Sequence, residues 1–190
     1  MKLRTSGLLL MALLLAGCWQ KSVNPFYTEK DLVAEPKLSG TWKEQKDGDE
    51  SEKMVWTFND VTPLRFDLTF RKGDEKLEYD AHVFRFEGAR FLDILSRSRE
   101  VSTLPVHHLF KIEELGATLK IAPLSTEWMQ KWLRKNPASL AHAVVVDPEH
   151  RDDREQDDLV LTADTKALQS FLRTHLKDDE FFAKPTTFGR

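Results

Sequence analysis

The sequence has little of several features that define large protein classes. Cys18 is the only cysteine among 190 residues, so no disulfide can form within the chain and the fold depends on a hydrophobic core. The apolar run over residues 7–14 is shorter than the roughly 20 residues that span a bilayer, and no later segment is apolar enough. Basic residues form no stripe, which makes nucleic acid and anionic lipid poor partner candidates.

Common catalytic motifs are also missing. The chain has no Gly-x-Ser-x-Gly elbow, no Ser-x-x-Lys pair and no phosphate-binding loop of the Walker type. Asp67, Glu78 and Asp93 are scattered carboxylates, and nothing in the sequence pairs them for acid–base chemistry. We therefore expect no catalysis and no cofactor, with an enzyme that lacks a known motif as the remaining alternative.

The N-terminal residues have the pattern of a targeting signal. Lys2 and Arg4 precede the apolar run, which is the pattern of a secretory signal, and Leu15-Ala16-Gly17-Cys18 follows it. This motif resembles the lipobox of bacterial lipoproteins. The resemblance implies a signal peptide over residues 1–17, cleavage before Cys18, and attachment of diacylglycerol and a further acyl chain such as palmitate at that residue.

Three acyl chains would hold the protein on a membrane permanently, whereas one chain binds only marginally. In the sorting rule of enteric lipoproteins, aspartate after the cysteine favours the inner membrane, so Trp19 favours the outer membrane, facing the periplasm. Residues 18–37 then form a lipidated tether and a lead-in segment. The tether over residues 19–23 is polar and reaches at most about 18 Å.

Alternating apolar and polar residues in the middle of the chain predict short antiparallel strands separated by turn residues. The parity changes at Phe84, which predicts a bulge near Val83. The expected strands cover residues 54–58, 64–70, 77–86, 91–95, 105–113 and 117–124. Their spacing favours a mainly β fold, an antiparallel barrel of about 8–9 strands.

Two helices interrupt this rhythm, one inserted late and one near the C-terminus. The first follows Ser125 and ends before Pro137, and the second is capped by Asp164 or Thr165. Residues 143–146 and 159–161 form the expected hairpin between them. We assign residues 38–180 to the β domain and residues 181–190 to a loosely held tail.

Gly40-Thr41-Trp42 precedes the first long strand and resembles the Gly-x-Trp opening of the lipocalins, in which the indole closes one end of the barrel. The chain departs from that family in two ways: a second Thr-Asp-Tyr-like motif is missing, and the helix after Ser125 interrupts the strand order. A second resemblance covers nearly all of the mature chain. The segments NPFYTEKDLV, SGTW, HVFRFEG, LPVHHLF and LTADTKALQSFLRTH are similar to a group of uncharacterised bacterial lipoproteins, which supports location and fold only.

Aromatic residues on the predicted inner face suggest a function for the barrel. Six phenylalanines are candidates to line a cavity for a small apolar ligand, such as a fatty acid: Phe66, Phe70, Phe84, Phe86, Phe91 and Phe110. They could equally fill the barrel, which would then be an interaction or assembly module of the envelope. In that alternative the partner surface is a helix face or the loop over residues 96–104, where Arg97 and Arg99 suit an acidic partner.

Metal binding is the less favoured interpretation of two further features. The histidines lack metal-ligand spacing, and His107 and His108 must point to opposite faces of one strand. The acidic segment 147–158 alternates at Asp153, Glu155 and Asp157 like a calcium loop, but Asp158 stands where an EF-hand needs glycine. The sequence therefore predicts no metal site.

Overall fold

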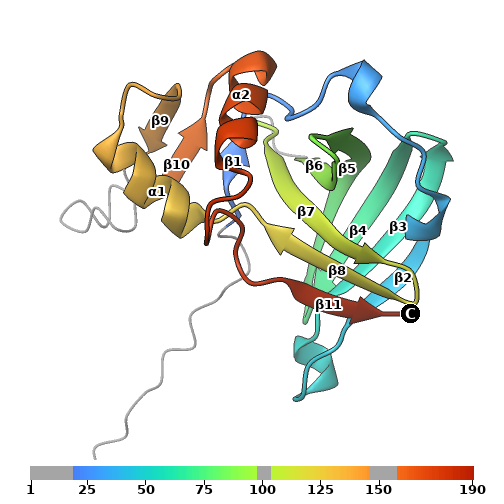
Figure 1. The fold of residues 1–190 in the computed structure, drawn as a ribbon. Coiled ribbons are helices and arrows are strands. Elements are labelled where there is room, and N and C mark those ends of the chain that lie inside the picture. Colours follow the sequence, from blue (N-terminus) through green and yellow to red (C-terminus); the bar gives the residue numbers. More distant parts are fainter. Residues whose placement is uncertain (1–18, 98–103, 146–157) are drawn as a thin grey trace, which may run out of the picture.

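The computed structural model describes residues 19–97, 104–145 and 158–190, and its centre is a closed antiparallel barrel (Figure 1). Strands β2 to β8 follow one another around the barrel, and β11 closes it between β8 and β2. The eight strands are β2 (Gly40–Glu44), β3 (Val55–Thr62), β4 (Arg65–Lys72), β5 (Glu75–Phe86), β6 (Ala89–Ser96), β7 (His107–Leu115), β8 (Thr118–Pro123) and β11 (Thr186–Gly189). The predicted fold class is confirmed.

Period-two alternation builds the interior. Trp56 and Phe58 on β3 and Phe66, Leu68 and Phe70 on β4 are buried in one cluster, while the residues between them face outward. Connections β2–β3, β4–β5 and β6–β7 meet at one end of this up-and-down barrel, which we call the open end.

The opposite end is covered by the lead-in, residues 24–37, which passes from β1 (Lys21–Ser22) through the short helices η1 (Glu29–Asp31) and η2 (Pro36–Leu38) to β2 (Figure 1). Gly40 enters β2 with φ +111°, a conformation that favours glycine. Trp42 is fully buried, its Nε1 donates to the Leu38 carbonyl at 2.8 Å, and the Arg190 guanidinium lies 4.6 Å from its ring centroid.

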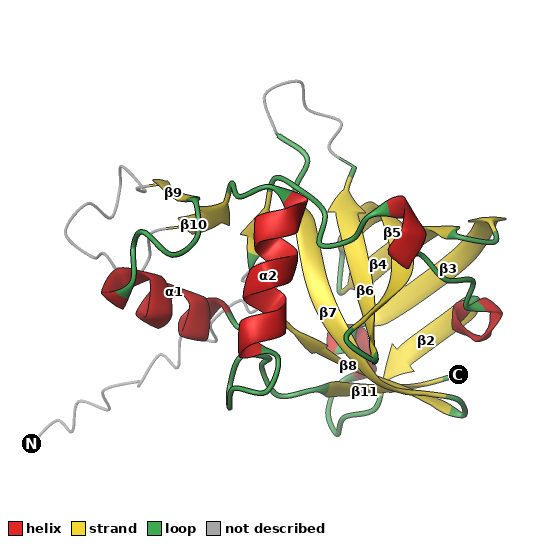
Figure 2. Cartoon of the chain, turned by 45° about the horizontal axis from the view of Figure 1, so that its top comes forward, coloured by secondary structure: helices red, strands yellow, loops and turns green. Residues whose placement is uncertain are grey.

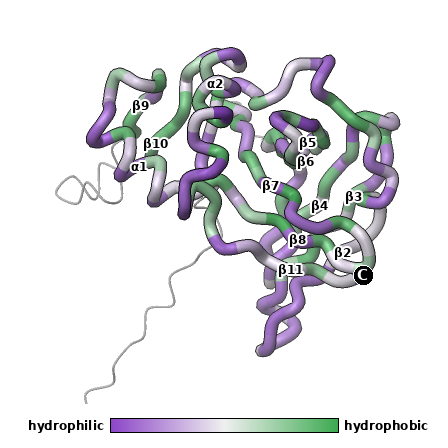
Figure 3. Tube along the Cα trace, viewed as in Figure 1, coloured by the Kyte–Doolittle hydropathy of each residue, from purple (hydrophilic) through white to green (hydrophobic). Residues whose placement is uncertain are grey.

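A second layer covers the outside of β5, β6 and β7. It contains α2 (Thr165–His175), α1 (Thr126–Lys135) and the hairpin of β9 (His142–Val145) with β10 (Asp158–Leu161), which continues the sheet through β1 (Figure 2). Both helices and the hairpin confirm the predictions. Ser125 and Asp164 cap the helices by accepting backbone N–H groups of Trp128 and Ala167. Hydrophobic and hydrophilic residues are mixed along α2 (Figure 3), and its buried residues Leu168, Phe171 and Leu172 belong to the core of this second layer.

The predicted bulge near Val83 is wrong. β5 pairs with β6 in unbroken register from Tyr79 to Phe86, and Val83 and Phe84 are both fully buried. Val83 faces the interior, and Phe84 faces the second layer, where it bridges to Leu32 of the lead-in. The change of parity in the sequence therefore reflects two buried faces rather than an extra residue.

The prediction of a loose tail is also wrong. Phe181 and Phe188 are buried, Ala183 donates its N–H to the Pro123 carbonyl at 2.9 Å, and β11 pairs with both β8 and β2. The last residues of the chain are thus part of the barrel wall. The short helix η3 (Glu50–Glu52) lies in the β2–β3 connection.

Replacement Trp42→Ala is expected to lower the free energy of unfolding by about 3–5 kcal/mol, because it removes a fully buried indole from the core. Urea denaturation of the two proteins measures this difference. The matched control is Leu64→Ala, which truncates a side chain that is 39% exposed. A loss below about 1 kcal/mol for Trp42→Ala would show that this indole is incidental to the barrel.

Candidate functional site

The interior of the barrel is filled by its own side chains. One void of about 40 Å³ lies among these side chains, beside Trp19 and Phe110, and it is far below the 300–1,000 Å³ that is usual for small-molecule sites. Phe66, Phe70 and Phe110 contribute to this filling, as predicted from their alternation. Trp56 also lines the void, and its Nε1 is buried without an acceptor among the described residues.

The other three phenylalanines that we expected inside the barrel lie outside it. Phe84 and Phe91 stack with ring centroids 5.2 Å apart in the second layer, and Phe86 packs against the same cluster. The expectation failed because the outer face of β5 and β6 is covered by the lead-in and α2, so apolar residues there do not mark the interior. This half of the predicted cavity lining is corrected.

Trp19 closes the open end. Its ring lies 5.0 Å from that of Phe110 and 5.7 Å from those of Trp56 and Phe70, measured between centroids. Trp19 is partly buried, Gln20 and Ser22 are buried, and Ser22 pairs with His107 at the start of β7. The expectation that residues 19–23 form a free polar tether is therefore wrong, because the indole finds an aromatic site inside the barrel.

His108 faces Trp19 from the barrel wall. Its Nδ1 lies 3.2 Å from the Gln20 carbonyl, to which it donates as a neutral imidazole, and its ring centroid is 5.7 Å from that of Trp19. Burial lowers the pKa of His108 to about 4, since a charged ring loses its hydration there. The docked N-terminal segment thus encloses a histidine that stays neutral at physiological pH.

His107, the residue before His108, points to the outer face and forms a buried pair with Asp93. Its Nδ1 lies 2.6 Å from Asp93 Oδ1, and Asp93 Oδ2 accepts the N–H of Phe26 at 3.2 Å. Ser22 stands opposite His107, but its hydroxyl donates to the Asn24 carbonyl, so no activated serine is formed. Because all three polar residues are buried beneath the lead-in, this cluster joins β1, β6, β7 and the lead-in.

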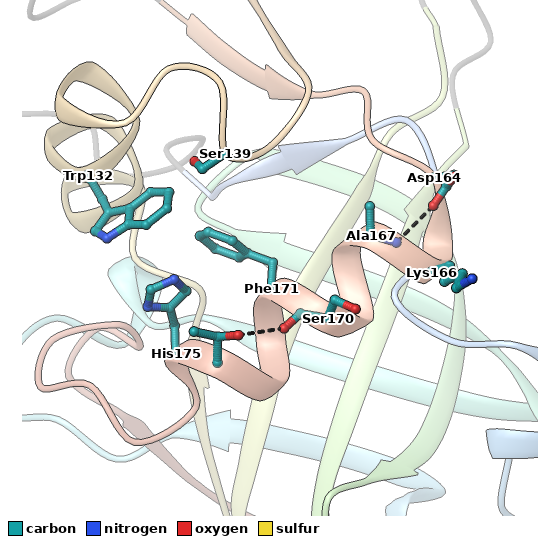
Figure 4. Close-up of a pocket in the computed structure, with 9 residues that line it drawn as sticks. Trp132, Ser139, Asp164, Lys166, Ala167, Ser170, Phe171 and His175 are labelled. Atoms are coloured by element: carbon teal, nitrogen blue, oxygen red, sulfur yellow. Dashed lines mark hydrogen bonds between the residues drawn. The ribbon is translucent and has the colours of Figure 1, made fainter.

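A groove of about 620 Å³ lies between α1 and α2 (Figure 4). Trp132 of α1 packs against Phe171 and His175 of α2 and forms one wall of the groove with them, with ring centroids 5.1 and 4.7 Å from the indole. Ser139, Ser170 and Thr174 add hydroxyl groups, and Lys166 lies toward the N-terminal end of α2. No motif in the sequence marks this groove, because its residues come from two helices that are distant along the chain.

The remaining sequence candidates do not converge. Nδ1 of His82 and of His142 each pairs with a backbone carbonyl, and His175 Nδ1 lies 2.6 Å from Asp178. Within the part of the chain that the structure describes, no three His, Cys, Asp or Glu residues are grouped to hold a metal ion. Cys18, Arg99 and the acidic residues Asp153, Glu155 and Asp157 lie outside the described residues.

Arg97 is already engaged. Its guanidinium forms ion pairs with Asp67 and Asp80, and the hydrogen bond from Arg97 lowers the pKa of the Asp80 carboxyl.

None of the described helices is long and apolar enough to cross a membrane. Comparisons of the chain with protein-family models, with curated proteins and with solved structures gave no match.

The free energy of unfolding is expected to fall by up to about 3 kcal/mol as the pH is lowered from 6.5 to 4. In this range His108 is protonated in the unfolded chain but stays neutral in the folded protein, because its pKa is lower there. Below pH 4 both states carry that proton and this contribution levels off. Urea denaturation across this range measures the slope. His108→Gln is expected to flatten it, whereas His142→Gln on the half-buried β9 should not. An unchanged slope in His108→Gln would contradict the assignment.

Proposed function

We propose that this chain is a lipid-anchored protein of the cell envelope, held by acyl chains on Cys18, and a non-enzymatic interaction module. The observation that carries the module is the barrel interior packed with aromatic side chains, in which the void beside the docked Trp19 measures about 40 Å³ and has no room for a fatty acid. The anchor is supported by residues 15–18 and by the resemblance to bacterial lipoproteins. Trp19 in place of aspartate favours the outer membrane, facing the periplasm.

The partner surface that we favour is the groove between α1 and α2. Its wall of Trp132, Phe171 and His175 suits an apolar side chain, since aromatic residues supply most of the energy at protein interfaces. Lys166 is exposed and has no ion-pair partner among the described residues. The occupant that fits both features is a segment of a partner protein that carries an apolar side chain beside a carboxylate.

Photo-crosslinking in cells tests this groove. A benzophenone side chain in place of Ala167, which lines the groove, is expected to give one discrete adduct, and the same group in place of the exposed Asn59 on β3 none. Lys166→Glu should reduce the adduct about fivefold, as an exposed ion pair contributes up to about 1 kcal/mol. Lys177→Glu is the matched control. Equal adducts at both positions, or an adduct that ignores Lys166→Glu, would contradict the groove.

A carrier of a small apolar ligand is the second candidate, and one observation favours it. Trp19 is the one aromatic ring in the described interior that no barrel strand contributes, so a ligand could replace it without breaking the barrel. The unpaired Trp56 Nε1 would then hydrogen-bond a polar atom of the ligand. Native mass spectrometry of a version beginning at Trp19, followed by organic extraction, separates the candidates: a stoichiometric apolar compound establishes the carrier, and an empty protein supports the module.

Cys18→Ser is expected to leave an unprocessed precursor or to release the protein into the soluble fraction, because the acyl acceptor is lost. Membrane fractionation and intact-mass measurement check this result. The conservative control is Ser22→Ala, which leaves the proposed lipobox untouched. Mature, membrane-bound Cys18→Ser protein would show that residues 15–18 are not a lipobox.

A further inference from the structure

Residues 19–26, which we call the N-terminal segment, connect the barrel to the second layer. In the described sheet, β1 alone lies between β7 of the barrel and β10 of the hairpin (Figure 1). Ser22 pairs with His107 on the β7 side and with Leu161 on the β10 side, and Lys21 pairs with Val160. The β9–β10 hairpin therefore joins the sheet of the barrel through two residues of this segment.

Hydrogen bonds outside this pairing also hold the N-terminal segment on β10. Gln20 Nε2 donates to the Leu159 carbonyl at 2.8 Å in a buried position. The N–H of Val23 donates to the Leu161 carbonyl at 2.8 Å. Since a buried carbonyl that loses its donor costs free energy, β10 depends on the presence of this segment.

The N-terminal segment is bonded to the start of α2 as well. Asn24 Nδ2 donates to the Ala163 carbonyl at 2.9 Å, and Thr165 Oγ1 donates to the Pro25 carbonyl at 2.9 Å. These two bonds lie on either side of the N-cap of α2. Three residues at this end of α2 line the groove between the helices: Asp164, Lys166 and Ala167.

The connection from α1 to β9 is tied to the same place. The Ala141 carbonyl accepts the N–H groups of Thr162 and Ala163 at 3.0 and 3.1 Å. Ser139, two residues before Ala141, lines the groove. Both the α2 side of the groove and this part of its rim therefore depend on where the N-terminal segment places residues 158–165.

Trp19 holds the other end of the segment in the barrel. Its ring contacts come from β3, β4, β5 and β7: Trp56, Phe70, Tyr79, His108 and Phe110. None of these partners lines the groove. A change at Trp19 therefore reaches the groove through residues 20–26.

We infer that docking of Trp19 in the barrel and the shape of the groove between α1 and α2 are coupled through residues 20–26. Release of Trp19 loosens β1, and with it β10 and the first turn of α2. Coupling between two sites is reciprocal, so a partner bound in the groove favours the docked Trp19. This last consequence rests on the proposed function of the groove. An apolar ligand that displaces Trp19 would then weaken binding of that partner.

Amide hydrogen exchange of the full-length protein in detergent, followed by mass spectrometry of its peptides, tests the coupling without a partner. Trp19→Ala is expected to raise exchange several-fold in residues 158–168. The second half of α2 should keep its protection, because Phe171 and Leu172 stay packed in the core of the second layer. The matched control is Phe66→Leu, which trims a buried ring beside Phe58 at the opposite end of the barrel. It should leave residues 158–168 unchanged relative to the barrel strands.

Unchanged exchange of residues 158–168 in folded Trp19→Ala protein would overturn the coupling. If Trp19→Ala does not fold, Gln20→Ala gives the same test, since it removes the bond to the Leu159 carbonyl and keeps the indole.

The benzophenone group at position 167 tests the consequence for a partner. Trp19→Ala is expected to reduce the adduct several-fold, and an undiminished adduct would overturn the coupling to partner binding. Absence of any adduct with Trp19 in place would instead refute the proposed partner of the groove, and the exchange result would stand by itself.

Discussion

The closure of the barrel by β11 is the constraint on which the rest of the structure depends. Without Thr186–Gly189, both β8 and β2 would present unpaired backbone groups along a sheet edge, and Phe188 would leave the core. The chain therefore has to return to the barrel after it has built α1, the β9–β10 hairpin and α2. That excursion stays close to the barrel because Leu124 bridges to Phe182, at the two points where the chain leaves and returns.

The excursion explains why part of the barrel wall is apolar on both faces. Leu168, Phe171 and Leu172 of α2 need a buried surface, and the outer faces of β5, β6 and β7 supply it with Phe84, Phe91 and Leu109. The lead-in is held in the same layer by hydrogen bonds from α2, since Gln169 donates to the Phe26 carbonyl and to Asp31. Asp93 satisfies the Phe26 N–H and His107 beneath it. A buried polar pair here fixes where the lead-in crosses the barrel.

The sequence was sufficient to predict an element where its residue pattern has a single local cause. The residues from Phe66 to Phe70 alternate because β4 has one wet face, and Ser125 and Pro137 bound α1 through local backbone chemistry. It was insufficient where burial depends on a distant segment. The sequence pattern places Phe84 and Phe91 in the interior, because it does not show that α2 covers them. β11 is only four residues long, which is too short for a clear pattern. The position of Trp19 depends on a space between aromatic rings that come from four different strands. The groove between α1 and α2 has no sequence signal for the same reason.

Trp19 helps to fill the open end of the barrel, and it directly follows Cys18, the residue proposed to carry the lipid anchor. Because this indole belongs to the same chain as its site, it competes with any soluble apolar ligand at an effective concentration in the millimolar range. A ligand must also replace the contacts that Trp19 makes with Trp56, Phe70 and Phe110. If it also displaces Gln20, the hydrogen bond from His108 to the Gln20 carbonyl is broken, at a further cost in free energy. The free protein is therefore biased toward the closed barrel. The same contacts that oppose a ligand also hold the segment from Trp19 to Ser22 on the barrel.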